Sequence, residues 1–226
     1  MMTPSTFLLP PLFDYSATFV WAISGALLGA RRGYAILGVI TIALVSATGG
    51  GLLRDGIFLQ DGAPVLLRNP NYLWLVAGGV LFVVLFGRWI VRVPAAERAI
   101  VMFDAAGLGA YAVVGMNRAL AAGVSLPGVI VVGMVNAVGG GILRDMLINT
   151  EPDMFMPGTL SQTLALVGCL LFLALIEGLS FSQFAAAWVT IGVVFVARLL
   201  SIRYNIETKP FRELAARRAR SDTTPR

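Results

Sequence analysis

The chain has 226 residues, of which 58% are hydrophobic and only 13% are charged, and its mean hydropathy is +0.83. This composition excludes a water-soluble globular protein and indicates an integral membrane protein. Lys and Arg outnumber Asp and Glu by 17 to 12, which gives a net charge of +5. The sequence contains no histidine and a single cysteine, Cys169. It therefore lacks the commonest acid–base group and metal ligand, and no disulfide can form within the chain.

Seven apolar runs are each long enough to cross a membrane, which takes about 20 helical residues. The spans are predicted at residues 12–30, 34–54, 71–91, 99–117, 126–144, 159–179 and 184–202. The segments between them are too short for a soluble domain. We therefore expect an all-α membrane protein with seven transmembrane helices, formed by a single domain over residues 1–202 and followed by a basic cytoplasmic tail at 203–226.

The basic residues predict the orientation of these helices. With the N-terminus outside, 14 of the 17 basic residues fall on the cytoplasmic side, including the eight from Arg198 onward, and only Arg54, Arg68 and Arg118 fall on the other. Cytoplasmic loops carry the excess of Lys and Arg in membrane proteins. We therefore expect the N-terminus outside and the C-terminus inside. The arginines of the tail suit anionic membrane lipids rather than nucleic acid.

A seven-residue motif occurs twice. Gly49–Gly51 is followed by Leu-Leu-Arg54-Asp55, and 90 residues later Gly139–Gly141 is followed by Ile-Leu-Arg144-Asp145. The same shift of 90 superimposes further residues of the first and second halves: Asp14 on Asp104, Gly25 on Gly115, Gly33 on Gly123 and Gly38 on Gly128.

Each copy of this repeat contains three predicted spans, at residues 12–91 and 99–179. Because three is odd, the second copy must enter the membrane from the opposite side. The sequence therefore predicts an inverted repeat of three plus three helices, with the seventh helix at 184–202 outside the symmetry. Such repeats usually enclose a path through the bilayer.

The glycine triplets, Gly49, Gly50, Gly51, Gly139, Gly140 and Gly141, have two interpretations. Glycine weakens a helix by about 1 kcal/mol relative to alanine, and loosened backbone inside a membrane must be buried in protein or face water. A bend that lines an aqueous path satisfies this requirement and is the interpretation that we favour for three glycines in succession. The alternative is close helix packing, which small residues permit in lipid.

Polar residues near the triplets point to the same region, because ionisable groups inside a span usually face an interior or a cavity. Asp14 and Asp104 are candidates for attracting cations or holding an arginine. The charged residues of the two motifs, Arg54 with Asp55 and Arg144 with Asp145, could form salt bridges across the pseudo-symmetry axis. Alternatively, they anchor helix ends at the lipid interface. Hydroxyl and amide oxygens just before the triplets could replace part of the water shell of an ion. The candidate polar and gating residues are Ser46, Thr48, Asn136, Arg54, Asp55, Arg144, Asp145, Asp14 and Asp104.

These residues resemble prokaryotic members of the trimeric intracellular cation channel family. The likeness rests on the doubled Gly-Gly-Gly-x-x-Arg-Asp motif, the opening Phe13-Asp14 and the matching Phe103-Asp104. The resemblance implies a homotrimer in an inner or plasma membrane, with one path per subunit lined by kinked second and fifth helices. It further implies passage of monovalent cations, chiefly K⁺ with Na⁺ also admitted, and no resident cofactor or metal.

Two functions from different classes remain open at this point. A channel would let ions pass the bends down their gradient. A secondary transporter of a small solute such as glycine, a label also given to relatives of this type, would rock one repeat against the other. The inverted repeat alone slightly favours a transporter, whereas the predicted spans show no cluster of aromatic and polar residues suited to a substrate. With the resemblance added, we favour the channel. Without histidine or a recognisable nucleophile and base, we do not expect an enzyme.

Overall fold

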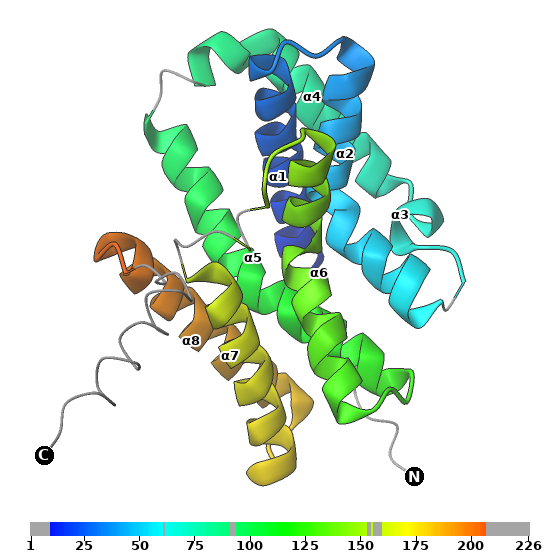
Figure 1. The fold of residues 1–226 in the computed structure, drawn as a ribbon, viewed down its shortest axis with the longest axis vertical. Helices are drawn as coiled ribbons and strands as arrows, with labels where there is room; N and C mark the ends of the chain where they lie inside the picture. The colour runs from blue at the N-terminus through cyan, green and yellow to red at the C-terminus, as the bar shows by residue number, and fades with distance from the viewer. Residues whose placement is uncertain (1–9, 61, 91–93, 153–154, 156–159, 207–226) are drawn as a thin grey trace, which may run out of the picture.

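The computed structural model describes residues 10–60, 62–90, 94–152, 155 and 160–206, and within these ranges every regular element is a helix (Figure 1). Most of the predicted cytoplasmic tail, residues 207–226, lies outside the described ranges. The elements in chain order are α1 (Pro11–Arg31), α2 (Ile36–Leu53), the π-helical η1 (Arg54–Leu59), α3 (Val65–Arg68), α4 (Asn71–Ile90), α5 (Pro94–Ala121), α6 (Leu126–Leu147), α7 (Ser161–Leu173), the π-helical η2 (Ala174–Gly178) and α8 (Gln183–Arg203).

Five helical stretches of the described chain are long and apolar enough to cross a membrane. They are α1, α2 with η1, α6, α7 with η2, and α8. The apolar part of α4 covers the shorter stretch Asn71–Gly87, and α5 is long but contains more charged and small residues than the other helices. The prediction of an all-α membrane protein is thus confirmed, whereas the count of seven spans stays a prediction.

Helix boundaries in the two halves recur at the spacing of the sequence repeat. The ends of α1 and α5, the starts of α2 and α6, and the starts of α4 and α7 are each 90 residues apart. The turns after α1 and α5 use Gly33 and Gly123, both at φ +72°. Such a backbone conformation is strained for residues with a side chain, so glycine at both positions lets the two turns be alike.

Each half has its own apolar core. In the first half α1 packs on α2 and α4, and in the second α5 packs on α6, α7 and α8. Small residues bring the helices together at equivalent places. A Cβ added at Gly25 of α1 would lie 2.8 Å from Cβ of Ser46 in α2, and one added at Gly115 of α5 would lie 2.7 Å from Cβ of Asn136 in α6. Close approach through glycine is the usual packing device of membrane helices.

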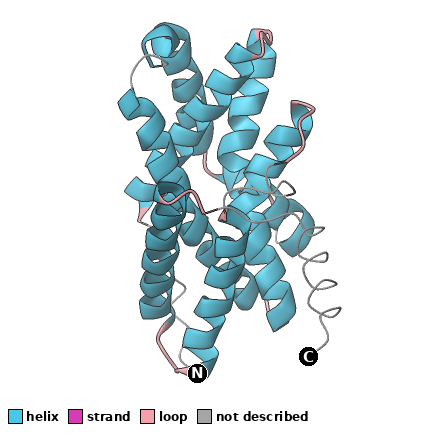
Figure 2. Cartoon of the chain, turned by 60° about the vertical axis from the view of Figure 1, so that its left-hand side comes forward, coloured by secondary structure: helices cyan, strands magenta, loops and turns pink. Residues whose placement is uncertain are grey.

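The two halves meet chiefly where α2 crosses α6, and α1 also contacts α5. Figure 1 shows α2 and α6 near the middle of the molecule, with α7 and α8 on the far side of α6 from α2. Only short loops join most of the described helices (Figure 2). The polar residues singled out by the sequence therefore gather around one crossing of helices from different halves.

Candidate functional site

The glycine triplets pack against each other at the crossing of α2 and α6. A Cβ added at Gly49 would lie 2.9 Å from Cα of Gly140, and one added at Gly139 would lie 3.3 Å from Cα of Gly50. A Cβ at Gly50 would overlap the backbone carbonyl of Asn136, and one at Gly140 would lie 3.1 Å from the carbonyl oxygen of Ser46. These contacts pair earlier residues of one helix with later residues of the other, so the two helices run antiparallel.

Close packing is therefore one clear role of the triplets, as the alternative interpretation of the sequence holds. Both helices continue as α-helix through their glycines, since α2 extends to Leu53 and α6 to Leu147. The triplets also border open space, because the last two glycines of each, Gly50, Gly51, Gly140 and Gly141, line a cavity.

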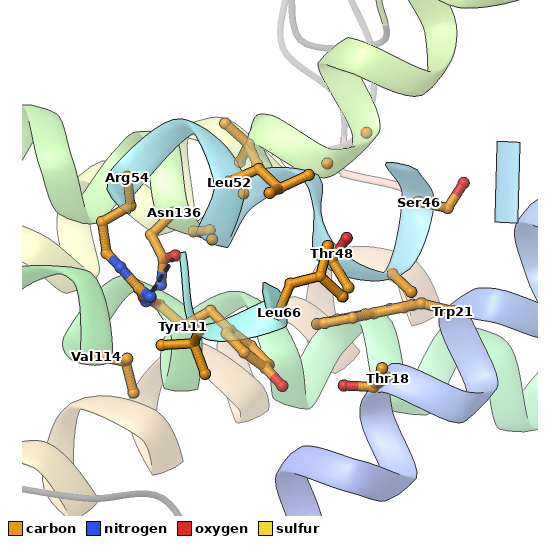
Figure 3. A pocket seen from close by; sticks show the side chains of 18 of the residues that line it. Thr18, Trp21, Ser46, Thr48, Leu52, Arg54, Leu66, Tyr111, Val114 and Asn136 are labelled. Carbon is orange, nitrogen blue, oxygen red and sulfur yellow. Dashed lines mark hydrogen bonds between the residues drawn. The ribbon is translucent and has the colours of Figure 1, made fainter. Parts of the chain in front are cut away.

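This cavity has a volume of about 830 Å³ and lies between the two halves. Most of the candidate residues from the sequence line it, and Figure 3 shows Arg54, Asn136, Tyr111, Thr18, Thr48 and Ser46 around it. Gly49 and Gly139 are not part of the lining and serve the helix contact instead. The lining polar and charged candidates are Asp14, Ser46, Thr48, Arg54, Asp55, Asp104, Asn136, Arg144 and Asp145.

Arg54 is held by three hydrogen bonds. Its Nε and Nη2 donate to the two carboxylate oxygens of Asp55 at 2.6 and 2.9 Å, and its Nη1 donates to Oδ1 of Asn136 at 3.1 Å. Asn136 Nδ2 in turn donates to the carbonyl oxygen of Tyr111 at 2.6 Å. The side chains of Arg54 and Asp55 are only 7% and 11% exposed. A bidentate pair satisfied on every side offsets the cost of burying two charges.

The second motif forms a similar but more open pair. Arg144 Nε donates to Oδ1 of Asp145 at 2.8 Å, and the Arg144 side chain is 25% exposed. In the repeat the residue equivalent to Asn136 is Ser46, whose shorter side chain has a buried hydroxyl without a hydrogen-bond partner in the described chain. The two motifs therefore differ: Arg54 is bound by Asn136, whereas Ser46, the equivalent of Asn136, leaves Arg144 more exposed.

Both ion pairs form within a motif, between neighbouring residues. These two ion pairs join neighbours within each half, and salt bridges across the pseudo-symmetry axis stay a prediction. At Arg54 the contact with the other half is made by the neutral side chain of Asn136, which accepts from Arg54. In each motif the arginine therefore pairs with the next residue of its own helical segment, Arg54 with Asp55 and Arg144 with Asp145.

Asp14 accepts hydrogen bonds from two phenols. The hydroxyls of Tyr72 in α4 and Tyr111 in α5 both donate to its carboxylate, and the Tyr111 ring packs on Trp21 with centroids 5.0 Å apart. Asp14 thus has tyrosines around it, where the sequence suggested a cation or an arginine. Neither tyrosine is among the candidates from the sequence, and Tyr111 lies in an otherwise apolar run.

The equivalent carboxylate, Asp104, is in a different environment. Its side chain is 59% exposed, and its Oδ2 lies 3.9 Å from Nη2 of Arg198 in α8. Arg198 was counted among the cytoplasmic basic residues, yet it is buried and lines the cavity. Arg118, which is exposed, lines the cavity as well. The signal that could have revealed Arg198 is its place inside the seventh predicted span rather than after it.

Thr48 also lines the cavity, but its hydroxyl donates to the carbonyl oxygen of Leu44 in its own helix at 2.8 Å. Ser46 lies one half-turn earlier and makes no such bond. The Ser46 hydroxyl is buried against Gly25 of α1, so of the two hydroxyls beside the first triplet it is the one that a solute does not reach in this structure. The groups of His, Cys, Asp and Glu in the described residues include no cluster suited to a bound metal ion.

Composition, fold and cavity define a helical membrane protein with a charged cavity between two related halves. The sequence matches the family model described as glycine transporter twice, over residues 11–88 and 101–177. A UPF0126 membrane protein of Deinococcus radiodurans is 38% identical over 156 residues, which are 69% of this chain and 71% of that protein. The inner membrane protein YadS of Escherichia coli K12 is 27% identical over 198 residues, 88% of this chain and 94% of that protein.

Solved structures with the same fold are cation channels. A chain from a study of conductance through TRIC cation channels has a TM-score of 0.80 at 27% identity and covers 90% of this chain and 97% of its own. The trimeric intracellular cation channel orthologue from Rhodobacter sphaeroides has a TM-score of 0.74 at 27% identity, with coverage of 86% and 97%. The chain thus belongs to the glycine transporter family of membrane proteins and is a prokaryotic member of the trimeric intracellular cation channel family.

Proposed function

We propose that this protein is a channel for monovalent cations, chiefly K⁺ with Na⁺ also admitted, and that the ions pass through the cavity between the two halves. The observation that carries the proposal is the lining itself. Charged residues of both motifs border one space of about 830 Å³. The charge of buried Arg54 is neutralised by the carboxylate of the adjacent Asp55. The path is therefore polar without an uncompensated positive charge at Arg54.

The inverted repeat would give this path its two entrances. Several observations support it: helix boundaries recur at 90 residues, and Arg32, after α1, donates to the carbonyl oxygen of Ile148, after α6. The start of α2 thus lies near the end of α6, as expected if these two equivalent helices run antiparallel. We place Arg54 and Arg144 on opposite sides of the crossing, with the N-terminus outside and residues 1–202 as one membrane domain.

The glycine triplets would act at the narrowest part of the path. Their first members allow α2 and α6 to touch, and their last members leave the wall without side chains beside that contact. A bend at the triplets would widen the passage, and the Thr48 hydroxyl, whose oxygen keeps its lone pairs while donating to Leu44, would help replace water around an ion. Each subunit would hold one such path, and three subunits would assemble as the trimeric relative does.

A transporter of a small solute such as glycine is the second candidate. The family model carries that description, and a cavity of about 830 Å³ falls within the range of small-molecule sites, about 300–1,000 Å³. A carrier would open this cavity to one side at a time. The two functions therefore differ in whether the path is ever continuous.

Purified protein in planar bilayers with different KCl concentrations on the two sides separates them. Discrete current steps that reverse at the K⁺ equilibrium potential are expected for the channel. Saturable glycine uptake into proteoliposomes without unitary currents would contradict the channel and support the carrier. Replacing K⁺ by Na⁺ and then by a large organic cation measures the selectivity in the same preparation.

A further inference from the structure

Three arginines in the cavity wall, Arg68, Arg118 and Arg198, belong to neither glycine motif, and of these only Arg198 is buried. Arg198 lies in α8 and is only 7% exposed. Its Nε and Nη1 are buried without a hydrogen-bond partner in the described chain, and its Nη2 lies 3.9 Å from Oδ2 of Asp104. That distance is longer than a hydrogen bond. The guanidinium is therefore near a counter-charge but is not clamped by it.

The motif arginines are held differently. Arg54 makes three hydrogen bonds of 2.6–3.1 Å, and Arg144 donates to Asp145 at 2.8 Å. Each has a carboxylate in direct contact, so its charge is largely cancelled at short range. Arg198 is less well compensated, because Coulomb energy falls with distance and the Asp104 side chain is 59% exposed to screening.

The position of Arg198 is fixed by tight packing of α8. One turn earlier, Val194 touches two glycines: a Cβ added at Gly109 of α5 would lie 3.0 Å from Cβ of Val194, and one at Gly168 of α7 would lie 2.7 Å from its Cγ2. These contacts hold α8 against α5 and α7, so the backbone at Arg198 cannot withdraw from the cavity. The side chain stays in the wall, where Arg198 and Asp104 both line the open space.

This charge has no counterpart in the other half, because α8 follows the two matched segments of the repeat. A cation moving along the cavity therefore meets it at one end only, beside Asp104. In the proposed orientation this is the cytoplasmic end.

We propose that Arg198 is the charge barrier that limits cation passage at this end of the path, and that Asp104 partly cancels it. The inference rests on the proposed channel function and adds a residue that controls its rate. A barrier placed at one end makes the path asymmetric, so the current should depend on the direction of flow. Arg198 is a conductance-setting residue and not a ligand of the ion.

The test is single-channel recording of Arg198→Gln in symmetric KCl. Removing the positive charge should raise the unitary conductance by about twofold or more and make inward and outward currents more equal. Asp104→Asn, which leaves the barrier without its partner, should lower the conductance. Because the Debye length falls from about 10 Å at 0.1 M to about 3 Å at 1 M salt, the difference between Arg198→Gln and the wild type should shrink at 1 M KCl.

Two variants control for structure. Arg198→Lys keeps the charge and should retain the wild-type current–voltage curve. Arg203→Gln removes an exposed arginine at the end of the same helix and should leave the asymmetry of the current unchanged. Size-exclusion chromatography of every variant verifies that the fold is intact.

The outcomes separate the two proposals. A conducting wild type with an Arg198→Gln variant of equal conductance and equal asymmetry would overturn the role of Arg198 and leave the channel in place. An effect of Arg198→Gln that Arg198→Lys reproduces would also overturn it, since the charge would not be the cause. A wild type without unitary currents would overturn the channel and this inference together.

Discussion

Two charged side chains in the cavity wall, Arg54 and Asp14, are each bound by several hydrogen-bond partners. Arg54 shares its donors between Asp55 in its own helix and Asn136 in the other half, and Asp14 receives two phenolic hydroxyls. Each arrangement provides several partners for one charged group. Removing one partner of a buried charge costs more than the same change at a surface, because the remaining charge is left less satisfied.

Substituting Asn136→Ala should therefore lower stability measurably. The change removes the hydrogen bond that Asn136 accepts from a buried guanidinium, which is worth about 1.5–3 kcal/mol. Thermal unfolding in detergent should show a lower midpoint for this variant. Thr41→Val is the matched control, because Thr41 is exposed and its hydroxyl bonds only to the carbonyl oxygen of Leu37 in its own helix. Equal midpoints for both variants would show that Asn136 does not carry this link.

At the scale of the element, α2 and α6 each use one glycine triplet for two purposes. Gly49 and Gly139 allow the backbones to meet, whereas Gly51 and Gly141 face open space, with the nearest atoms to an added Cβ 3.8 and 4.0 Å away on Arg54 and Arg144. Hydropathy and the repeat predicted where these helices lie. They did not predict which glycine faces which neighbour, because that depends on how the helices are rotated against each other.

The separation of roles can be tested with leucine. Gly51→Leu should project into the cavity and reduce cation flux by about tenfold, while the unfolding midpoint stays near that of the wild type because no atom lies closer than ordinary contact. Flux of K⁺ into proteoliposomes measures the first quantity and thermal unfolding the second. Gly50→Leu should instead destabilise the protein, since its side chain would overlap the Asn136 carbonyl.

Gly56→Leu serves as the control for added volume. Gly56 is exposed and an added Cβ would meet nothing within 4 Å, so both flux and stability should be unchanged. If Gly51→Leu conducts as well as Gly56→Leu does, the conduction path does not pass beside the triplets.

For the whole molecule, the proposed inversion sends equivalent residues to opposite sides of the membrane. Ala35 and Ser125 are 90 residues apart and occupy the same place, directly before α2 and α6. Both are exposed. The only native thiol, Cys169, is buried, so a cysteine introduced at either position can be labelled selectively.

Ala35→Cys and Ser125→Cys should therefore react with a membrane-impermeant maleimide from opposite sides of sealed vesicles. In the proposed orientation Ser125→Cys is labelled from outside, and Ala35→Cys only from the cytoplasmic side or after permeabilisation. The unsubstituted protein, which keeps buried Cys169, gives the background. Labelling of both positions from one side would contradict the inverted repeat.

The sequence alone determined that this is an all-α membrane protein, where its helices lie and which motif is doubled, because hydropathy and glycine content are local properties of the chain. Tertiary structure decided the partners of the charges. Arg54 meets Asn136 across 82 positions, and Asp14 meets Tyr72 and Tyr111 across 58 and 97. Such pairings depend on which helix faces come together, and that information lies in the packing of the whole bundle rather than in any one segment.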